Sequence, residues 1–273
     1  MIKNNFKVIY NYSIKIGGAI FAFLGFVSVF IDISSCFPRW SNAILCILCI
    51  LVFVVLMACI YALTIRKKEV FLSKNQKSLT VSYGDLFEDN SKIKVIAVNR
   101  CFDTEVNGEL ISPQSLHGKW IQQHLKNISV SDLNNQINES LKNQGCKGEF
   151  IQDKHKGSQI RYPLGTIAEI YDGEIRYYLL ALTEMDSNLN SHCTLEDYCY
   201  SISKLMHYYD MHGQGNNMVI PIIGSGFARL DRSEKELLDL MISLIKIHQT
   251  DMRGNIKIIV HNKLRSLVPI ADL

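Results

Sequence analysis

A glycine loop after a short apolar run is the strongest chemical signal in this sequence. Val219–Ile223 is continuously apolar, as expected of a strand buried on both faces, and Gly224-Ser225-Gly226 follows it directly. Glycines let backbone N–H groups approach an anion, and a helix that begins nearby favours negative charge. Arg229 could add a charge-assisted hydrogen bond to a phosphate. The loop therefore predicts a phosphate site, and the alternative is a plain glycine turn, since Arg229 replaces the last glycine of Gly-x-Gly-x-x-Gly.

A second group of polar side chains follows the strand predicted over Ile93–Val98. Asn99 comes directly after this strand, where its side-chain amide could hydrogen-bond a sugar hydroxyl. Asp103 could make the same kind of contact, and Phe102 could stack on a flat ring. The alternative is an Asx turn, in which the asparagine side chain bonds to the following backbone. For this segment taken by itself, the turn is the favoured interpretation.

Asp85 follows a third predicted strand, Leu79–Tyr83, after Gly84. An aspartate in this position could accept a hydrogen bond from an adenine amino group. A Gly-Asp pair is more often a simple turn, so Asp85 is informative only beside the other two groups.

Other kinds of chemistry have no support in the sequence. The eight histidines are dispersed, with no His-Glu-x-x-His motif and no Cys/His cluster, so no metal site is predicted. No Gly-x-Ser-x-Gly nucleophile motif occurs, and no catalytic residue is assigned. A net charge of +3 is too small to indicate a nucleic-acid partner. The eight cysteines lack metal-ligand spacing and are interpreted as packing residues.

Strands and helices are predicted to alternate along the chain after residue 69. This alternation is typical of an α/β fold with a mixed or parallel sheet covered by helices on both faces. Ligands on such sheets bind at the carboxyl ends of the strands, where the polar groups above lie. The expected strands are Leu79–Tyr83, Ile93–Val98, Arg176–Leu182, Val219–Ile223 and Ile256–His261, and the expected helices run over Pro113–Lys126, Asp132–Asn143, Thr194–His212 and Ser233–Gln249.

Two long apolar segments, Ile16–Ile33 and Ala43–Ile65, occupy the N-terminal part of the chain. Only Asp32 is charged within them, and roughly 20 apolar residues are needed to cross the hydrocarbon core of a bilayer. Backbone N–H groups in lipid must bond within their own segment, so both segments are expected to be helical. The sequence therefore predicts a transmembrane helical hairpin within residues 1–69 and a soluble domain over 70–273.

The charges that flank these segments predict their orientation. Lys7 and Lys15 precede the first segment and Arg66-Lys67-Lys68 follows the second, whereas the connecting loop sets Arg39 against Asp32. Because positively charged flanks stay inside, both termini and the soluble domain are expected in the cytoplasm, with a multi-pass hairpin in the cell inner membrane. The alternatives are that the first segment is a cleaved signal peptide, or that the hairpin is only an anchor.

The first apolar segment also carries a stripe of small residues. Gly18, Ala22 and Gly25 recur at helical spacing, and such a stripe lets membrane helices approach one another closely. The stripe suggests a homo-oligomer, and the alternative is that glycine is simply common in membrane helices.

Taken in order, the polar motifs resemble the macro domain, which binds ADP-ribose. Gly84-Asp85-Leu86, Val98-Asn99 and Pro221-Ile-Ile-Gly-Ser-Gly226 carry this resemblance. More narrowly, three motifs are similar to the divergent macro domain of Thoeris ThsA proteins, whose membrane form places two transmembrane helices before the domain. These motifs are Asn99-x-x-Phe102-Asp103-Thr104, Tyr162-Pro-Leu-Gly165-Thr166 and Ile223-Gly-Ser-Gly-Phe-Ala-Arg-Leu230.

The resemblance implies a function and a set of ligand contacts. Members of that family are bacterial antiphage effectors, for which a partner TIR-domain enzyme converts NAD into an ADP-ribose-type messenger, histidine-ADP-ribose in the membrane form. The macro domain binds this nucleotide signal, and the effector then assembles and damages the lipid bilayer. By position, Asp85 would contact adenine, Gly224, Ser225, Gly226 and Phe227 would hold the diphosphate, Asn99, Phe102 and Asp103 would line the distal ribose and its substituent, and Thr166 and Arg229 would complete the site.

One departure from the wider macro-domain pattern bears on catalysis. The Asn-Ala-Ala-Asn motif and glycine run of hydrolytic macro domains are missing, since Arg-Cys-Phe-Asp follows Asn99. This favours a binding domain without a cofactor over an enzyme. The alternatives are a membrane-tethered ADP-ribosyl or nucleotide hydrolase, with Asp103 as the water-activating group, and a scaffold that binds nothing.

Overall fold

The computed structural model describes residues 6–28, 40–74, 76–125, 127–186, 190–224, 230–271 and 273. The chain divides into two compact units. One contains Met1–Lys68 together with Arg265–Leu273, and the other contains Glu69–Leu264. The expected boundary after residue 69 differs from this division at the C-terminus, because the last residues group with the apolar helices.

The first unit is built on helices α1 (Phe6–Ser28) and α2 (Trp40–Thr64). Both contain a stretch long and apolar enough to cross a membrane, Ile9–Val27 in α1 and Cys46–Thr64 in α2. α1 begins earlier than the predicted residue 16, and the end of the first predicted span lies outside the described residues. The large side chains along the middle of α2 are mostly exposed.

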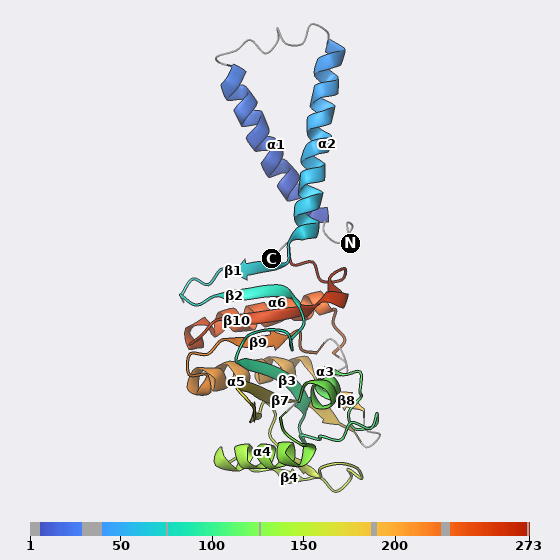
Figure 1. The fold of residues 1–273 in the computed structure, drawn as a ribbon, viewed down its shortest axis with the longest axis vertical. Helices are drawn as coiled ribbons and strands as arrows, with labels where there is room; N and C mark the ends of the chain where they lie inside the picture. Colours follow the sequence, from blue (N-terminus) through green and yellow to red (C-terminus); the bar gives the residue numbers. More distant parts are fainter. Residues whose placement is uncertain are drawn as a thin grey trace. The chain divides into compact units, whose positions relative to one another are not determined.

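The two helices of this hairpin contact each other near the start of α1 and the end of α2 (Figure 1). The Tyr12 hydroxyl donates to the Tyr61 hydroxyl at 2.6 Å, and the two rings stack with centroids 4.0 Å apart. A Cβ built on Gly18 would meet no atom within 4 Å, so that glycine is not part of the contact within the hairpin. A role of the small-residue stripe between copies stays a prediction.

The second unit contains a mixed sheet flanked by helices, as the sequence predicted. Strands β2, β10, β9, β3 and β7 are parallel in that order, and β6 and β8 pair antiparallel with β7. In spatial order, the sheet runs β1 (Lys67–Val70), β2 (Leu79–Gly84), β10 (Ile256–His261), β9 (Met218–Pro221), β3 (Ile93–Asn99), β7 (Ile175–Met185) and β6 (Ile167–Asp172), with β8 (Ser191–His192) beside β7, and a separate small sheet pairs β4 (Glu149–Phe150) with β5 (Ile160–Arg161).

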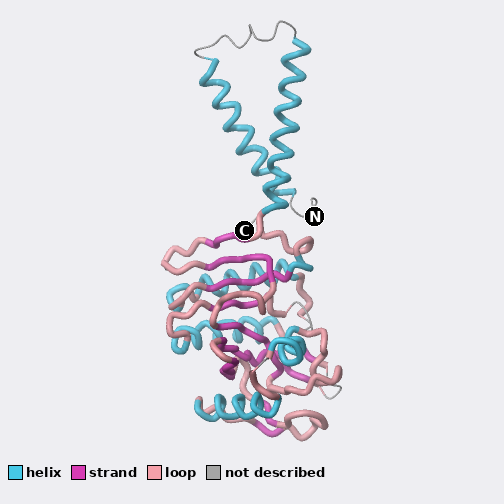
Figure 2. The backbone as a smooth tube through the Cα atoms, in the orientation of Figure 1, coloured by secondary structure: helices cyan, strands magenta, loops and turns pink. Residues whose placement is uncertain are grey.

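Helices cover both faces of this sheet (Figure 2). Alternate residues of β7 show the two layers: Leu179 packs in a cluster with Leu133 of α4, whereas Tyr178 meets Tyr208 of α5 edge to face. The side of the sheet that carries Leu179 is covered by α3 (Leu116–Lys119), a π-helical turn η3 (Trp120–His124) and α4 (Val130–Asn143), and the other by α5 (Leu195–His212) and α6 (Glu234–Ile247).

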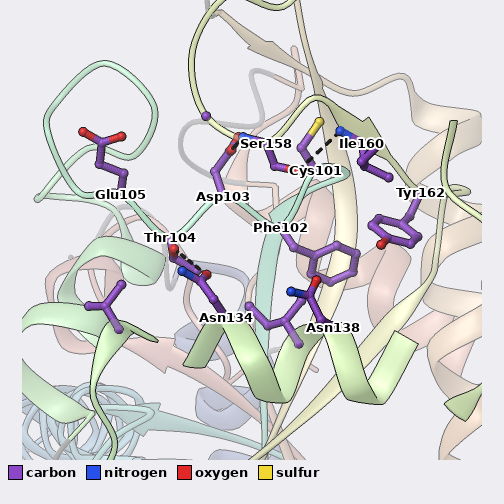
Figure 3. A pocket seen from close by; sticks show the side chains of 13 residues that line it. Cys101, Phe102, Asp103, Thr104, Glu105, Asn134, Asn138, Ser158, Ile160 and Tyr162 are labelled. Carbon is purple, nitrogen blue, oxygen red and sulfur yellow. Dashed lines mark hydrogen bonds between the residues drawn. The ribbon is translucent and has the colours of Figure 1, made fainter. Parts of the chain in front are cut away.

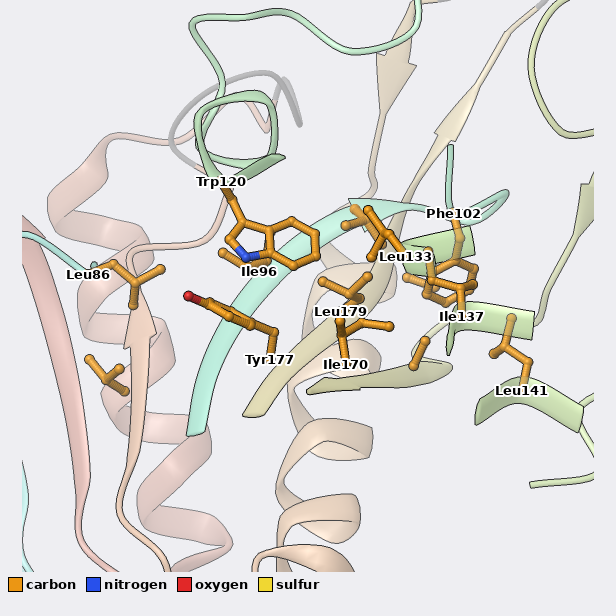
Figure 4. Close-up of a cluster of buried hydrophobic side chains, with 14 of the residues drawn as sticks. Leu86, Ile96, Phe102, Trp120, Leu133, Ile137, Leu141, Ile170, Tyr177 and Leu179 are labelled. Atoms are coloured by element: carbon orange, nitrogen blue, oxygen red, sulfur yellow. The ribbon is translucent and has the colours of Figure 1, made fainter. Parts of the chain in front are cut away.

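The core on the α4 side is centred on aromatic residues (Figure 4). Trp120 is fully buried and lies 5.0 Å from the ring of Tyr177, and Leu133 and Ile137 of α4 fill the space beside them. Burying such side chains is the main favourable term for folding this unit.

Helix starts follow from capping residues, and two predicted starts differ from the structure. α4 begins at Val130 after the capping box of Ser129, rather than at Asp132. α5 and α6 begin at the predicted capping boxes of Thr194 and Ser233. The helix expected over Pro113–Lys126 instead begins at Leu116, because the Ser115 hydroxyl caps the N–H of Gly118. It then widens into the π-helical turn, which sequence periodicity does not predict.

Candidate functional site

The parallel strands bring the predicted polar groups to one edge of the sheet. β2 ends beside Asp85, β10 ends at His261, β9 leads to Gly224, and β3 ends at Asn99. Carboxyl ends of parallel strands meet at the same edge, so these four residues form a row in the order of the strands. We call this row the ligand edge.

Asp85 begins the row in a turn that leaves part of its carboxylate accessible. Its Oδ1 accepts a hydrogen bond from the Phe87 N–H at 2.8 Å, and its Oδ2 lies 3.9 Å from Nε2 of His261. The side chain of Asp85 is 36% exposed, so an acceptor oxygen remains available to a ligand. Asp85 therefore forms the turn, and its contact with adenine stays a prediction.

A buried lysine fixes the turn that carries Asp85. Nζ of Lys94 donates to the Phe87 carbonyl at 2.7 Å, and burial lowers the pKa of this ammonium below its usual value. The Phe87 ring stacks on His124 of the π-helical turn with centroids 3.8 Å apart. These contacts hold the start of the ligand edge in place before any ligand arrives.

Gly224 stands at the end of β9 in a conformation that favours glycine. Its φ is +90°, and a Cβ would lie 2.7 Å from Leu230 and 3.3 Å from Tyr198. The remaining predicted residues of this loop, Ser225, Gly226, Phe227 and Arg229, lie outside the described residues. The described part of the loop therefore fits a glycine turn at the sheet edge.

Asn99 organises the loop after β3 from inside. Its Oδ1 accepts from the N–H groups of Cys101 at 3.0 Å and Asp103 at 3.3 Å, and its Nδ2 donates to the Asp103 carboxylate at 3.0 Å. The side chain is buried and its amide is used within the protein. Asn99 therefore forms the Asx turn that was the alternative to a direct sugar contact.

Asp103 forms a buried ion pair that the sequence did not predict. Nζ of Lys154 lies 2.5 Å from Oδ2 of Asp103, and the two side chains are 5% and 2% exposed. Oδ1 of Asp103 accepts from the Ser158 N–H at 2.7 Å. With Asn99 as a further donor, both carboxylate oxygens are satisfied, which is the condition for keeping a charge in a protein interior.

Phe102 lies in the core rather than in an open stacking position. Its φ is +51°, it is 4% exposed, and it packs in the same cluster as Leu133. Its ring meets Tyr162 edge to face with centroids 5.7 Å apart. The positive φ is uncommon outside glycine and marks a sharp turn of the chain at Phe102.

A cavity of about 530 Å³ opens beside this loop (Figure 3). Its walls come from the loop after β3, from α4 and from the segment around β5, and Thr104 donates to Oδ1 of Asn134 at 2.8 Å across one side. Glu105 and Asn138 also line it. The complete lining is Cys101, Phe102, Asp103, Thr104, Glu105, Val130, Asn134, Ile137, Asn138, Gly157, Ser158, Ile160 and Tyr162.

Charged residues tie the β5 wall of the cavity to the main sheet. Arg100 donates to the Tyr162 carbonyl at 3.0 Å and to Glu184 of β7 at 2.9 Å. Arg161 of β5 bonds to the same glutamate. The wall therefore has a fixed position beside Asn99, at the end of the ligand edge.

Thr166 lies at the start of β6, beside the last part of β7. Its N–H donates to the Pro163 carbonyl at 3.2 Å, and its carbonyl accepts from Ala181 at 2.9 Å. The structure thus brings Asn99, Phe102 and Asp103 into direct contact, whereas Asp85 and Gly224 belong to the same edge at other strands.

Several residues of the site were not predicted from sequence. Lys154 and Ser158 come from a polar segment with no periodic pattern, and only the fold brings them to Asp103. Tyr162 was recognised only as part of a motif, without its contact with Phe102. His261 was predicted only as the end of a strand. Because β10 and β2 are parallel neighbours, their ends lie side by side, and this could have identified His261 as a neighbour of Asp85.

A protein family and a curated relative match the part of the chain that contains this edge. The family described as Thoeris protein ThsA, Macro domain matches residues 79–261, more than half of the chain. The curated Thoeris protein ThsA of Bacillus amyloliquefaciens (strain Y2) is 25% identical over 195 residues. That match covers 70% of this chain and 64% of the relative, so the chain spans less than two thirds of the relative's length.

Solved macrodomain structures have a lower sequence identity to this chain. A mutant of the Oceanobacillus iheyensis macrodomain with ADPR is 11% identical, covers 71% of this chain and 89% of its own, and has a TM-score of 0.49. Thermosipho africanus DarTG in complex with ADP-ribose is 14% identical, covers 74% of this chain and 46% of its own, and has a TM-score of 0.45. Because the family match runs from the first residue of β2 to the last of β10, the chain belongs to the macro-domain family of Thoeris protein ThsA.

Proposed function

We propose that this protein is a membrane effector of antiphage defence whose macro domain binds an ADP-ribose-type signal along the ligand edge. The observation that carries the proposal is the row of strand ends that the family match encloses, from Asp85 past Gly224 to Asn99. A dinucleotide-like ligand has its adenine, diphosphate and distal ribose in a line. The accessible carboxylate suits the adenine, the glycine turn suits the diphosphate, and the ordered loop suits the distal ribose.

In this arrangement each end of the signal has its own surroundings. Adenine lies against the turn of Asp85, whose free oxygen accepts from the exocyclic amino group. The diphosphate lies on the loop that begins at Gly224, and the distal ribose lies beside the loop ordered by Asn99. The ribose is then held by the surface of this loop, since the Asn99 amide itself is already bonded.

The cavity beyond this loop accommodates the group carried by the distal ribose. Its Glu105 carboxylate and Asn138 amide are exposed polar groups, and Val130 and Ile160 supply apolar surface. This combination suits an amino-acid-like substituent with N–H donors and a small ring, such as the histidine of histidine-ADP-ribose.

The same geometry supports binding rather than hydrolysis. The carboxylate of Asp103, which a hydrolase would need as its base, is buried and bonded to Lys154 and Ser158. Cys101 is the other potential nucleophile beside the cavity, and burial raises the pKa of its thiol. A buried carboxylate that is bonded on both oxygens and a thiol whose pKa is raised are poor starting points for activating water.

The two apolar helices supply the output of the proposed mechanism. In this mechanism they span the cell inner membrane with both termini in the cytoplasm, where a TIR-domain enzyme makes the signal; their length and apolar character support this role. Ligand binding promotes assembly of several copies, and the gathered hairpins disrupt the bilayer. The signal must therefore bind the assembled form more tightly than the resting form, because a ligand with equal affinity for both shifts nothing.

Titration of the full chain in lipid nanodiscs tests the binding step. ADP-ribose and histidine-ADP-ribose are both expected to bind, and Asp85→Ala is expected to weaken both by about tenfold, as for the loss of one hydrogen bond to a charged acceptor. Glu105→Ala should weaken only the histidine-bearing ligand. Glu109→Ala is the matched control, because this exposed residue of the same loop forms only a surface ion pair with Lys156.

Two results would count against the proposal. If calorimetry detects no heat of binding with ADP-ribose and none with histidine-ADP-ribose, the soluble domain is a scaffold without a ligand. Steady release of product from the bound nucleotide, lost in Asp103→Asn, would instead identify a hydrolase.

A further inference from the structure

The hairpin unit contains a segment from the far end of the chain. Arg265–Leu273 groups with Met1–Lys68, although the whole macro domain separates them in sequence. The chain therefore passes between the two units twice, once after Lys68 and once after Leu264. A hairpin that served only as a tether would need a single connection.

The C-terminal segment is packed into the base of the hairpin. Ala271 is 4% exposed and lies in one apolar cluster with Ile9 of α1 and with Ala58 and Ala62 of α2. Val268 and Ile270 of the same segment are fully buried. The alanines of α2 are four residues apart, so they present a small-residue face that lets another element approach the helix. The segment thus contacts both helices at the point where they meet.

A charged contact adds to this apolar one. The guanidinium of Arg265 donates to the carbonyl of Leu63 in the last turn of α2. The last carbonyls of a helix have no partner within the helix and carry the negative end of its dipole, so a cation here is favourable.

In sequence, the same segment follows β10 after a short turn. β10 ends at His261, whose Nε2 lies 3.9 Å from Asp85 and whose Nδ1 accepts from the Lys263 N–H at 3.2 Å. A short 3-10 turn, Asn262–Leu264, follows, and Arg265 is the next residue. One turn of chain therefore links the neighbour of the proposed adenine contact to the residue that caps α2.

We propose that Arg265–Leu273 is a transmission strap. It holds the base of α1 against α2, and it carries a change at the turn after β10 into the hairpin when a ligand contacts Asp85 and His261. The second half of this statement rests on the proposed function, because it needs a ligand at that edge. The first half depends only on the packing of the segment.

Dityrosine cross-linking of the full chain in liposomes tests the holding role. Tyr12 and Tyr61 are stacked, so photo-oxidation should join them in the native protein, and mass spectrometry of the linked peptides gives the yield. Two variants test the strap: Ala271→Glu, which puts a charge into the apolar cluster, and a chain that ends at Leu264. In both, the cross-linking yield should fall at least about fivefold, a ratio that corresponds to about 1 kcal/mol. Leu267→Glu is the matched control and should cross-link normally, because Leu267 is 55% exposed. Native yield in the shortened chain would overturn the strap.

A second measurement on the same variants tests transmission. Ala271→Glu should bind histidine-ADP-ribose with native affinity and yet fail to release dye from liposomes in response to it. Dye release equal to that of the native chain would overturn the transmitting role. If the native chain binds histidine-ADP-ribose and ADP-ribose without releasing dye with either, the membrane part of the proposed function fails, and the cross-linking yields still decide whether the strap holds the hairpin.

Discussion

Asp103 and Lys154 form a buried ion pair between two loops that are distant in sequence. An aspartate after a strand end suggested a ligand contact, and the structure uses its charge to hold two loops together. Lys154 reaches it from a separate loop and also donates to the Ser158 carbonyl. The pair fixes the wall of the cavity, so its loss is expected to lower the free energy of unfolding.

Lys154→Met is expected to destabilise the protein by about 3–5 kcal/mol, because it leaves the Asp103 carboxylate buried without its cation. The double variant Asp103→Leu with Lys154→Met should recover most of this loss, since it removes both charges. Chemical denaturation of the full chain in detergent measures the difference. Equal stability of Lys154→Met and the native chain would mean that the pair is open to water.

His117 predicts a pH dependence. It is buried, its Nε2 has no hydrogen-bond partner among the described residues, and burial lowers its pKa from 6.5 to about 4. The unfolded chain binds the proton more readily, so the free energy of unfolding should fall as pH drops from 6.5 towards 4, by at most about 3 kcal/mol. His117→Leu should lose this part of the dependence, as denaturation at pH 7 and pH 5 would show. A pH slope unchanged by this substitution would contradict the assignment.

The contacts of single residues could be predicted only in part. Asn99 was correctly considered for an Asx turn, because that bond is local and depends on residues close in sequence. The partners of Asp103 are distant in sequence, and no pattern in the chain indicates them. Local chemistry is therefore predictable here, whereas contacts made by folding are not.

Helix α4 protects the edge strand of the sheet. Gln136 bonds to both the N–H and the carbonyl of Tyr171, at 2.8 and 3.2 Å. Ser140 accepts from the Glu169 N–H at 2.8 Å, and Gln144 donates to the Ile167 carbonyl at 3.0 Å. Four residues of helix rise about 6 Å and two residues of strand about 6.6 Å, so the two rows match.

Gln136→Ala is expected to cost about 1–3 kcal/mol, because it leaves two backbone groups of β6 without partners. It should also make the protein associate at high concentration through the uncovered edge, since free strand edges pair with other chains. Denaturation and light scattering measure the two effects. Asn135→Ala, on the exposed side of the same helix, is the control and should do neither. Native stability of Gln136→Ala would show that water replaces the side chain at no cost.

At the level of elements, strong local signals were confirmed and weak ones were missed. The five predicted strands and the capping boxes of α5 and α6 are present. β6 was missed because Glu169 and Tyr171 interrupt its apolar residues, which gives neither a continuous run nor a strict alternation. Its place in the sheet depends on pairing with β7 and on the side chains of α4, and neither is local.

At the scale of the whole molecule, the chain joins a family domain to two apolar helices. The macro domain and the apolar character of the helices followed from sequence. The grouping of Arg265–Leu273 with the helices did not, because a short apolar C-terminus has no distinguishing pattern. The chain therefore passes between the macro domain and the helices twice, once after Lys68 and once after Leu264.

Release of dye from liposomes that hold the full chain tests the central claim most directly. Adding histidine-ADP-ribose is expected to release the dye, and Asp85→Ala is expected to shift the required concentration upward by about tenfold. Vesicles that stay sealed at saturating concentrations of both histidine-ADP-ribose and ADP-ribose would contradict it.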